Sequence, residues 1–280
     1  MSNTIMTSPR TRRVASGLAI VAVLWSVIPL IWMLITAFKP QNAIRTSTPE
    51  FLFAPTLVNF QNLFSGGNSV GPFIVNSVIV SVVSTIIAVG LGVVAGYGLC
   101  HWKSRGKKDL AFWIISTRMA PIAAVIVPLF VMFRQVGLID NLLGLIVAYL
   151  TFNLPFAIWL MSAFFAEVPP SLQEAAQIDG CNKWQAFRLV VVPTTIPGII
   201  ATAVLCLVFA WNDYAFASSF AGPSSQTLPM TAGSLITQTG VDWGQLCALG
   251  LITVLPMIVV GLAVRKHLAT GLSMGAVTGE

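Results

Sequence analysis

The sequence predicts an all-α membrane protein with six transmembrane helices, and three observations support this fold class. Of the 280 residues, 56% are hydrophobic and only 9% are charged, whereas a soluble domain carries roughly 25% charged residues. The apolar residues gather in runs of about 20, the length that a helix needs to cross a bilayer. Lys and Arg concentrate in alternate segments between these runs. We therefore expect residues 1–280 to form one membrane domain.

Six apolar runs are long enough to be membrane spans. The first run follows three arginines and looks like a signal peptide, but it is longer than a signal-peptide core and no A-x-A cleavage site follows it. We therefore interpret it as a retained span. The predicted spans are 14–38, 72–100, 110–133, 142–165, 195–220 and 245–264, with a loop at 166–193 and a tail at 265–280.

The basic residues predict the orientation of these spans. Eleven Lys and Arg lie in the N-terminal segment, the 101–109 loop, the 166–193 loop and the tail, against three in the alternate loops. Cytoplasmic loops carry the excess of Lys and Arg in membrane proteins. Both termini and the 166–193 loop are therefore predicted to be cytoplasmic. The net charge of +6 follows from the same rule and gives no reason to expect a nucleic-acid partner.

The spans also carry residues that predict close packing and bends. The second span has small residues at intervals of four, which allow two helix backbones to approach closely; they are Ser84, Ala88, Gly92 and Gly96. Prolines inside spans each remove a helix hydrogen bond and favour bending around a path. These prolines are Pro29, Pro121, Pro128, Pro155 and Pro256.

Polar residues inside spans are the candidates for a solute path, because charge in a bilayer usually faces a cavity or a partner. On straight helices Arg118 would lie ~12 Å and Asp213 ~27 Å from the cytoplasmic side, too far apart for an ion pair. Asn153 falls midway down the fourth span. Trp211-Asn212-Asp213 suits a sugar, which the indole would stack against; an interfacial aromatic followed by residues emerging into water is the competing interpretation. For Arg118, binding to helix carbonyls, gating and substrate contact all stay open.

The sequence contains no catalytic constellation, no metal-ligand spacing and no P-loop. We therefore expect neither enzymatic activity nor a bound cofactor or metal in this chain. A chain of buried carboxylates, typical of a proton-coupled carrier, is also missing from the spans. The cysteines are expected to be reduced structural thiols; they are Cys100, Cys181, Cys206 and Cys247.

The 166–193 loop predicts two short helices joined at a glycine corner. Ser171 and Glu174 have the spacing of a capping box, and Gly180 is a candidate left-handed helix stop. Asn182 is expected to start the second helix and Pro193 to end it. An exposed elbow of this kind suits contact with another protein.

The same loop resembles the EAA signature of ABC-importer permeases. Glu174-Ala175-Ala176 is followed after three residues by Gly180 and after nine more by Val190-Val191-Val192-Pro193, where valines replace the usual Ile and Leu. Further stretches resemble the carbohydrate-uptake branch, in particular the G-type inner-membrane subunit of the maltose system. They are 137–141, 154–159, 163–165, 209–213 and the tail 271–279.

The resemblance implies a type I ABC importer permease that forms half of the path for a sugar, either a di- or oligosaccharide or a polyol. It implies an inner (plasma) membrane location in a bacterial-type cell, a homologous second permease, an extracytoplasmic sugar-binding (lipo)protein and a dimer of ATPase subunits that bind ATP and Mg. Contact with the ATPase falls to Glu174, Ala175, Ala176, Ile178, Asp179, Gly180 and Pro193, with Gly271, Ser273, Gly275 and Gly279 of the tail as a second contact.

Two other classes of function remain to be weighed. One is an ion-coupled secondary carrier for a small polar solute, against which the lack of buried acids and of two equivalent repeat halves argues. The other is a membrane scaffold without transport, which would leave Arg118 and the bent helices without a role.

Overall fold

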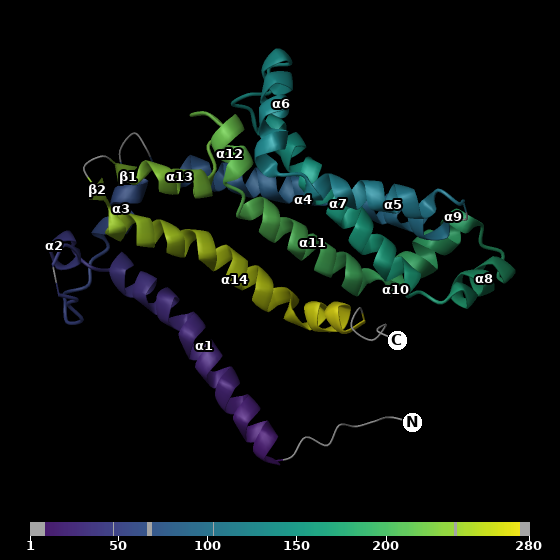
Figure 1. The fold of residues 1–280 in the computed structure, drawn as a ribbon, viewed down its shortest axis with the longest axis horizontal. Coiled ribbons are helices and arrows are strands. Elements are labelled where there is room, and N and C mark those ends of the chain that lie inside the picture. The colour runs from purple at the N-terminus through teal and green to yellow at the C-terminus, as the bar shows by residue number, and fades with distance from the viewer. Residues whose placement is uncertain (1–8, 47, 66–68, 103, 238–239, 275–280) are drawn as a thin grey trace. The chain divides into compact units, whose positions relative to one another are not determined.

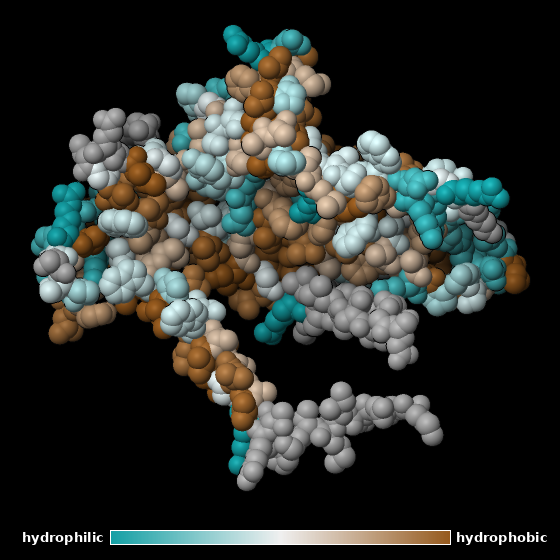
Figure 2. All heavy atoms as spheres, viewed as in Figure 1, coloured by the Kyte–Doolittle hydropathy of each residue, from teal (hydrophilic) through white to brown (hydrophobic). Residues whose placement is uncertain are grey.

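The computed structural model describes residues 9–46, 48–65, 69–102, 104–237 and 240–274, and Figure 1 traces them. The chain divides into two compact units. One takes Met1–Ser69 and Leu235–Val254, and the other takes Val70–Ser234 and Leu255–Glu280. Figure 2 shows hydrophobic side chains over much of the face in view, including most of the described part of α1. Such a surface suits lipid, and the chain is a multi-pass membrane protein.

The first unit is built around the long helix α1, Pro9–Ala37. It also holds α2 (Gln41–Ile44), α3 (Val58–Phe64), the antiparallel pair β1 (Ile236–Thr237) and β2 (Gly240–Val241), and the start of α14 (Trp243–Met274). The last carbonyls of a helix have no partner inside it. Here the buried amide of Asn59 donates to the carbonyls of Ala37 at 2.9 Å and Lys39 at 2.8 Å, which fixes the end of α1 against α3.

The second unit is built on three helices that run side by side, α4 (Gly71–His101), α7 (Leu142–Ala166) and α11 (Ile196–Trp211). The predicted stripe of small residues is confirmed, since all four of its members are buried on α4. A Cβ atom added to Gly92 would lie 2.7 Å from the Cβ of Ala157, so α4 and α7 meet almost backbone to backbone. This pair forms the core of the unit.

The predicted third span is not one straight helix. It consists of α5 (Lys107–Ser116), the 3-10 turn η1 (Thr117–Met119) and α6 (Ile122–Gln135), with a bend of 89° between the two halves. The cause is Pro121, which lacks an amide hydrogen and forces the residue before it out of the helical region. Ala120 accordingly has an extended ψ of 135°. The other four predicted span prolines lie inside continuous helices.

The predicted fifth span also needs correction. The helical segment Lys183–Thr194 meets α11 at a bend of 72°, and α11 ends at Trp211 rather than at residue 220. Two short helices follow, α12 (Ala215–Phe220) and α13 (Leu228–Ser234). Within the described residues four helices could cross a membrane alone, and up to six spans result if each bent pair is one span.

Two loops of the second unit are joined by Asp140, which has a positive φ of 53°. Its carboxylate accepts hydrogen bonds from the backbone amides of Gly222 at 3.0 Å and Ser225 at 3.0 Å, and from the Ser225 hydroxyl at 2.8 Å. Burial raises the pKa of Asp140, but the hydrogen bonds from Ser224, Ser225 and Gly222 outweigh it and hold the pKa below its ordinary value. The ionised carboxylate therefore fastens the α6–α7 loop to the α12–α13 loop.

Candidate functional site

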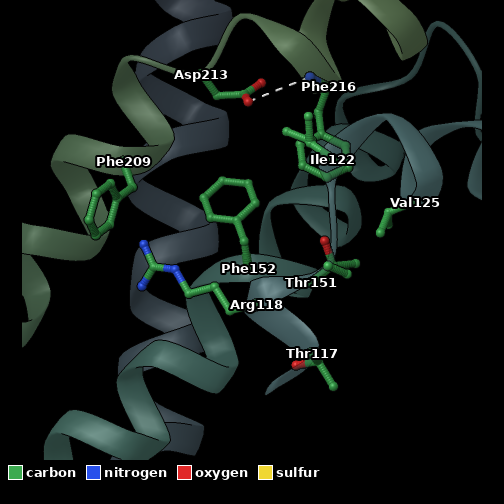
Figure 3. Close-up of a pocket in the computed structure, with 10 residues that line it drawn as sticks. Thr117, Arg118, Ile122, Val125, Thr151, Phe152, Phe209, Asp213 and Phe216 are labelled. Atoms are coloured by element: carbon green, nitrogen blue, oxygen red, sulfur yellow. Dashed lines mark hydrogen bonds between the residues drawn. The ribbon is translucent and has the colours of Figure 1, made fainter. Parts of the chain in front are cut away.

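A cavity in the second unit has a volume of about 590 Å³ and is shown in Figure 3. The break at Pro121 shapes one wall, because the turn on either side of it faces the cavity. The other walls come from α7 and from the junction of α11 with α12. The lining residues are Thr117, Arg118, Ala120, Ile122, Val125, Thr151, Phe152, Phe209, Asp213 and Phe216.

Arg118 brings a positive charge to this mostly apolar cavity. Its guanidinium carbon lies 4.2 Å from the ring centroid of Phe156 and 4.4 Å from that of Phe209, and the two rings meet edge to face 5.4 Å apart. Aromatic rings at this distance attract a cation. In the described part of the chain no carboxylate is within ion-pair distance of Arg118. Its N–H groups are therefore held toward the cavity without an acidic partner.

Asp213 also lines the cavity, although its carboxylate is engaged by the start of α12. It accepts from the backbone amides of Ala217 at 3.1 Å and Phe216 at 3.5 Å, the second of which is drawn in Figure 3. Tyr149, buried on α7, interacts with the same carboxylate. The straight-helix estimate separated Arg118 from Asp213 in depth, whereas the bent helices bring both to one cavity.

The other candidates for the path do not line this cavity. Asn153 is fully buried, and its amide donates to the carbonyl of Cys206 at 3.1 Å, so it ties α7 to α11. Trp211 is buried, and the Asn212 side chain donates to the Val208 carbonyl of its own helix at 2.8 Å.

Sequence reasoning missed the aromatic lining of the cavity. Phe152 and Phe209 belong to runs in which almost every residue is apolar, so hydrophobicity does not distinguish a cavity wall from a lipid contact, and Phe216 lies just after such a run. The only available signal was Thr151, a polar residue beside Phe152 in the fourth span.

The elbow at 166–193 begins with α8, Pro170–Ile178, which ends in a Schellman motif. Gly180 has φ +90°, its amide donates to the Gln177 carbonyl at 3.1 Å, and the Cys181 amide donates to the Ala176 carbonyl at 3.0 Å. The left-handed stop predicted at Gly180 is confirmed.

The second elbow helix, α9 (Lys183–Ala186), starts with the expected cap. The Asn182 side chain accepts a hydrogen bond from the backbone N–H of Gln185 at 2.9 Å. The Gln185 side chain in turn accepts one from the backbone N–H of Asn182 at 2.8 Å. This reciprocal capping box confirms the predicted start.

Two details of the predicted elbow are wrong. Ser171 makes no cap to α8, because the helix already begins at Pro170, a residue suited to a first helical position. Pro193 does not end the second helix either. The chain continues from α9 through the π-helical turn η2 (Phe187–Val191) and α10 (Val192–Thr194), and Thr195 at its end donates its hydroxyl to the Val191 carbonyl at 2.9 Å.

The elbow exposes most of the residues that the EAA resemblance singles out. Glu174, Ala175, Asp179 and Gly180 are exposed, and so is Ile178, at 86%. Ala176 is the exception and is buried. An isoleucine this exposed at a helix end offers apolar surface that the described residues leave uncovered.

An aromatic cluster fastens the elbow to the ends of the long helices. The ring centroid of Tyr97, on α4, lies 4.3 Å from that of Phe187 on η2 and 5.6 Å from that of Phe165 on α7. The Tyr97 hydroxyl forms a side-chain hydrogen bond with Gln173 on α8. These side chains join four elements of the second unit, α4, α7, α8 and η2.

The candidate tail contacts are only partly described. Gly271 and Ser273 lie in the backbone of α14, and Gly275 and Gly279 lie outside the described residues.

All four cysteines are free thiols.

The chain matches the family described as "Binding-protein-dependent transport system inner membrane component" over residues 88–273. A similar protein is the "Probable ABC transporter permease protein y4oR" of Sinorhizobium fredii, 34% identical over 249 residues that cover 89% of each chain. The "Trehalose transport system permease protein SugB" of Mycobacterium tuberculosis is 33% identical over 91% of this chain and 93% of its own length.

The fold also has a solved counterpart. A chain of a bacterial ABC transporter involved in the import of the acidic polysaccharide alginate superposes with a TM-score of 0.69 at 22% identity, covering 94% of this chain and 99% of that one. At this identity the likeness concerns the fold.

Proposed function

Because the chain belongs to the family of binding-protein-dependent transport system inner membrane components, and is therefore an ABC-transporter permease rather than an enzyme, we propose that its solute is a sugar. The support comes from relatives such as SugB and the "Trehalose/maltose transport system permease protein MalG" of Thermococcus litoralis, 26% identical over 94% of this chain. An oligosaccharide or a polyol fits this proposal.

The cavity beside Arg118 is the proposed part of the sugar path in this subunit, and its chemistry carries the proposal. Sugars present apolar C–H faces and hydroxyl rims. The rings of Phe152, Phe209 and Phe216 suit the faces, and the N–H groups of Arg118 and the hydroxyl of Thr151 suit the rims. Asn153, Trp211 and Asn212 would then support the walls.

The proposed orientation has six membrane crossings, with each bent helix pair counted as one, and both termini in the cytoplasm. The distribution of Lys and Arg supports it. The two units would form one permease domain over residues 1–280 in the inner membrane.

The elbow is the proposed contact with an ATPase dimer, which would bind ATP and Mg. Glu174, Ala175, Ile178 and Asp179 offer exposed surface on the α8 side of the Gly180 corner, and the tail is a second proposed contact. Closure of the ATPases would displace the elbow, and the Tyr97 cluster would pass that movement to α4 and α7. A homologous permease and an extracytoplasmic binding protein complete the assembly.

Uptake by the full assembly in proteoliposomes tests this function. We expect trehalose or maltose uptake that requires ATP and the binding protein, and a large loss of uptake in Arg118→Gln because the charged wall of the cavity is removed. Arg134→Gln, which changes an exposed arginine in the last turn of α6, is the matched control.

Uptake driven by an ion gradient without ATP would refute the proposal. The comparisons lend no support to an ion-coupled carrier. Normal uptake by Arg118→Gln would refute only the assignment of the cavity.

A further inference from the structure

A second cavity, of about 240 Å³, lies within the first unit at the C-terminal end of α1. Its walls are mostly apolar, and a single cation, Lys39, is among them. The sugar path proposed above makes no use of it. The residues lining it are Pro29, Trp32, Met33, Thr36, Lys39, Ile44, Trp243 and Cys247.

Lys39 is buried to an unusual degree for a lysine, with only 3% of its surface exposed. Its ammonium lies 5.3 Å from the ring centroid of Trp32 and 5.4 Å from that of Phe53. Ring faces attract a cation, but an ammonium has three donors that need hydrogen-bond acceptors. Buried charges are normally paired, because an unpaired one is costly.

Neither acid in the described part of this unit supplies that pair. Glu50 is exposed and lies outside ion-pair distance of Lys39. Asp242 is already engaged, since its carboxylate accepts from the Gln41 side chain at 2.7 Å and from the Gln245 side chain at 2.7 Å. The cavity therefore holds a buried cation whose anion has to come from elsewhere.

The location of Lys39 indicates a lipid as the source. The apolar part of α1, Arg13–Ala37, has 25 residues and is ~37 Å long, against ~30 Å for the hydrocarbon core. Lys39, two residues beyond its end, is therefore at the level of the head groups. Trp32 and Trp243 suit the same level, where tryptophan is enriched in membrane proteins. The side chains of α1 leading to the cavity are exposed and apolar, as lipid contacts are.

We propose that this cavity binds the phosphate of an anionic phospholipid, with Lys39 as its counter-ion. A volume of 240 Å³ equals that of about eight waters, at ~30 Å³ each, which suits a phosphate with its ester groups. A zwitterionic head group fits less well, because its own ammonium would meet Lys39 and find no free acid in the described walls. The apolar wall residues would contact the glycerol and the start of the acyl chains.

Native mass spectrometry of the purified full assembly tests this site, with phosphatidylglycerol, phosphatidylcholine or inorganic phosphate added. We expect the wild type to retain phosphatidylglycerol over phosphatidylcholine roughly fivefold or more, as expected for one basic residue at a membrane surface. Lys39→Met should remove that preference, and Lys39→Arg should keep it. The matched control is Arg45→Met, which removes an exposed cation from the same segment and should change nothing.

If Lys39→Met fails to assemble, Cys247→Phe carries the test. It fills the cavity while leaving Lys39 in place, and it should also abolish retention of phosphatidylglycerol. Equal retention of both lipids, or undiminished retention by an assembled Lys39→Met, would overturn the proposal. So would displacement of the lipid by inorganic phosphate, which would assign the cavity to a free anion. A cross-link from Cys247 to another subunit that excludes lipid would assign it to that subunit.

Discussion

Replacement of Gly96 with alanine should loosen the α4–α7 pair on which the second unit is built. A Cβ at this position would lie 2.8 Å from the Met161 Cβ, 2.9 Å from the Ser162 backbone nitrogen and 3.1 Å from the Ile158 carbonyl oxygen. Carbon atoms are in favourable contact at about 3.5–4.0 Å. Since two of the three neighbours are backbone atoms, no side-chain rotation can relieve the clash, and the two helices must separate by roughly 1 Å.

Overpacking of this kind costs about 1–3 kcal/mol. Alanine is also the better helix former, by about 1 kcal/mol, and this gain has to be separated from the loss. Gly98→Ala separates them, because it lies on the same helix and a Cβ there has nothing within 4 Å. The difference between the two variants measures the packing cost.

Thermal unfolding of the detergent-purified protein is the assay. We expect the unfolding midpoint of Gly96→Ala to lie several degrees below that of Gly98→Ala. Domains somewhat smaller than this chain lose about 2–4 °C in midpoint per kcal/mol of destabilisation. Equal midpoints would refute the close approach of α4 and α7. As a further check, Ala157→Gly should recover part of the loss in Gly92→Ala, because the nearest atom to the added Cβ is the Ala157 Cβ.

Three more outcomes are expected. Gly180→Ala places a side chain at φ +90°, costs about 1–2 kcal/mol and should reduce stimulation of ATP hydrolysis by the binding protein. Asn182→Ala removes the cap and should lower stability in a denaturant titration by about 1 kcal/mol. Asp140→Asn should cost on the order of 1–3 kcal/mol at pH 7. Because the pKa of Asp140 is lowered, its contribution is present above the ordinary ~3.9 and is lost as pH falls through the folded pKa. The difference between the unfolding midpoints of wild type and Asp140→Asn should therefore be smaller at pH 3 than at pH 7.

Two of these outcomes have a matched control. Gly106→Ala changes a glycine with negative φ and open space around it, so stimulation of ATP hydrolysis should persist. Glu50→Gln neutralises an exposed acid and should leave the pH dependence of unfolding intact. Equal stimulation of ATP hydrolysis in Gly106→Ala and Gly180→Ala would show that the left-handed conformation at Gly180 is not required. If wild type and Asp140→Asn stay equally far apart at both pH values, the carboxylate is not what joins the loops.

Local chemistry explains what the sequence predicts well. Gly180 and Asn182 form hydrogen bonds with residues only three or four positions away. A short stretch of sequence is therefore enough to predict the helix end and the helix start that they form. Ser171 misleads for an equally local reason, since the proline before it takes the first helical position. The helix bounds follow hydrophobicity wherever a span is continuous.

Tertiary context explains what the sequence does not predict. Pro121 breaks its span by 89°, whereas Pro155 lies inside the continuous α7, and both stand within predicted spans. Asp140 finds its partners 82 to 85 residues away. Arg118 and Asp213 line one cavity, which the depth estimate did not predict because it assumed a straight helix that the bend at Pro121 removes.

The π-helical turn η2 lies in the second half of the elbow, between α9 and the bend that leads to α11. A π-helical turn holds one residue more than an α-helical turn, and each residue of an α-helix rotates the chain by about 100°. The extra residue therefore sets the rotational phase between α9 and everything that follows it. Removal of one residue from η2 would restore a regular α-helix but turn the elbow through about 100°. The exposed Ile178 and Trp184 of the elbow would then face a different direction relative to α11 and the helices packed against it.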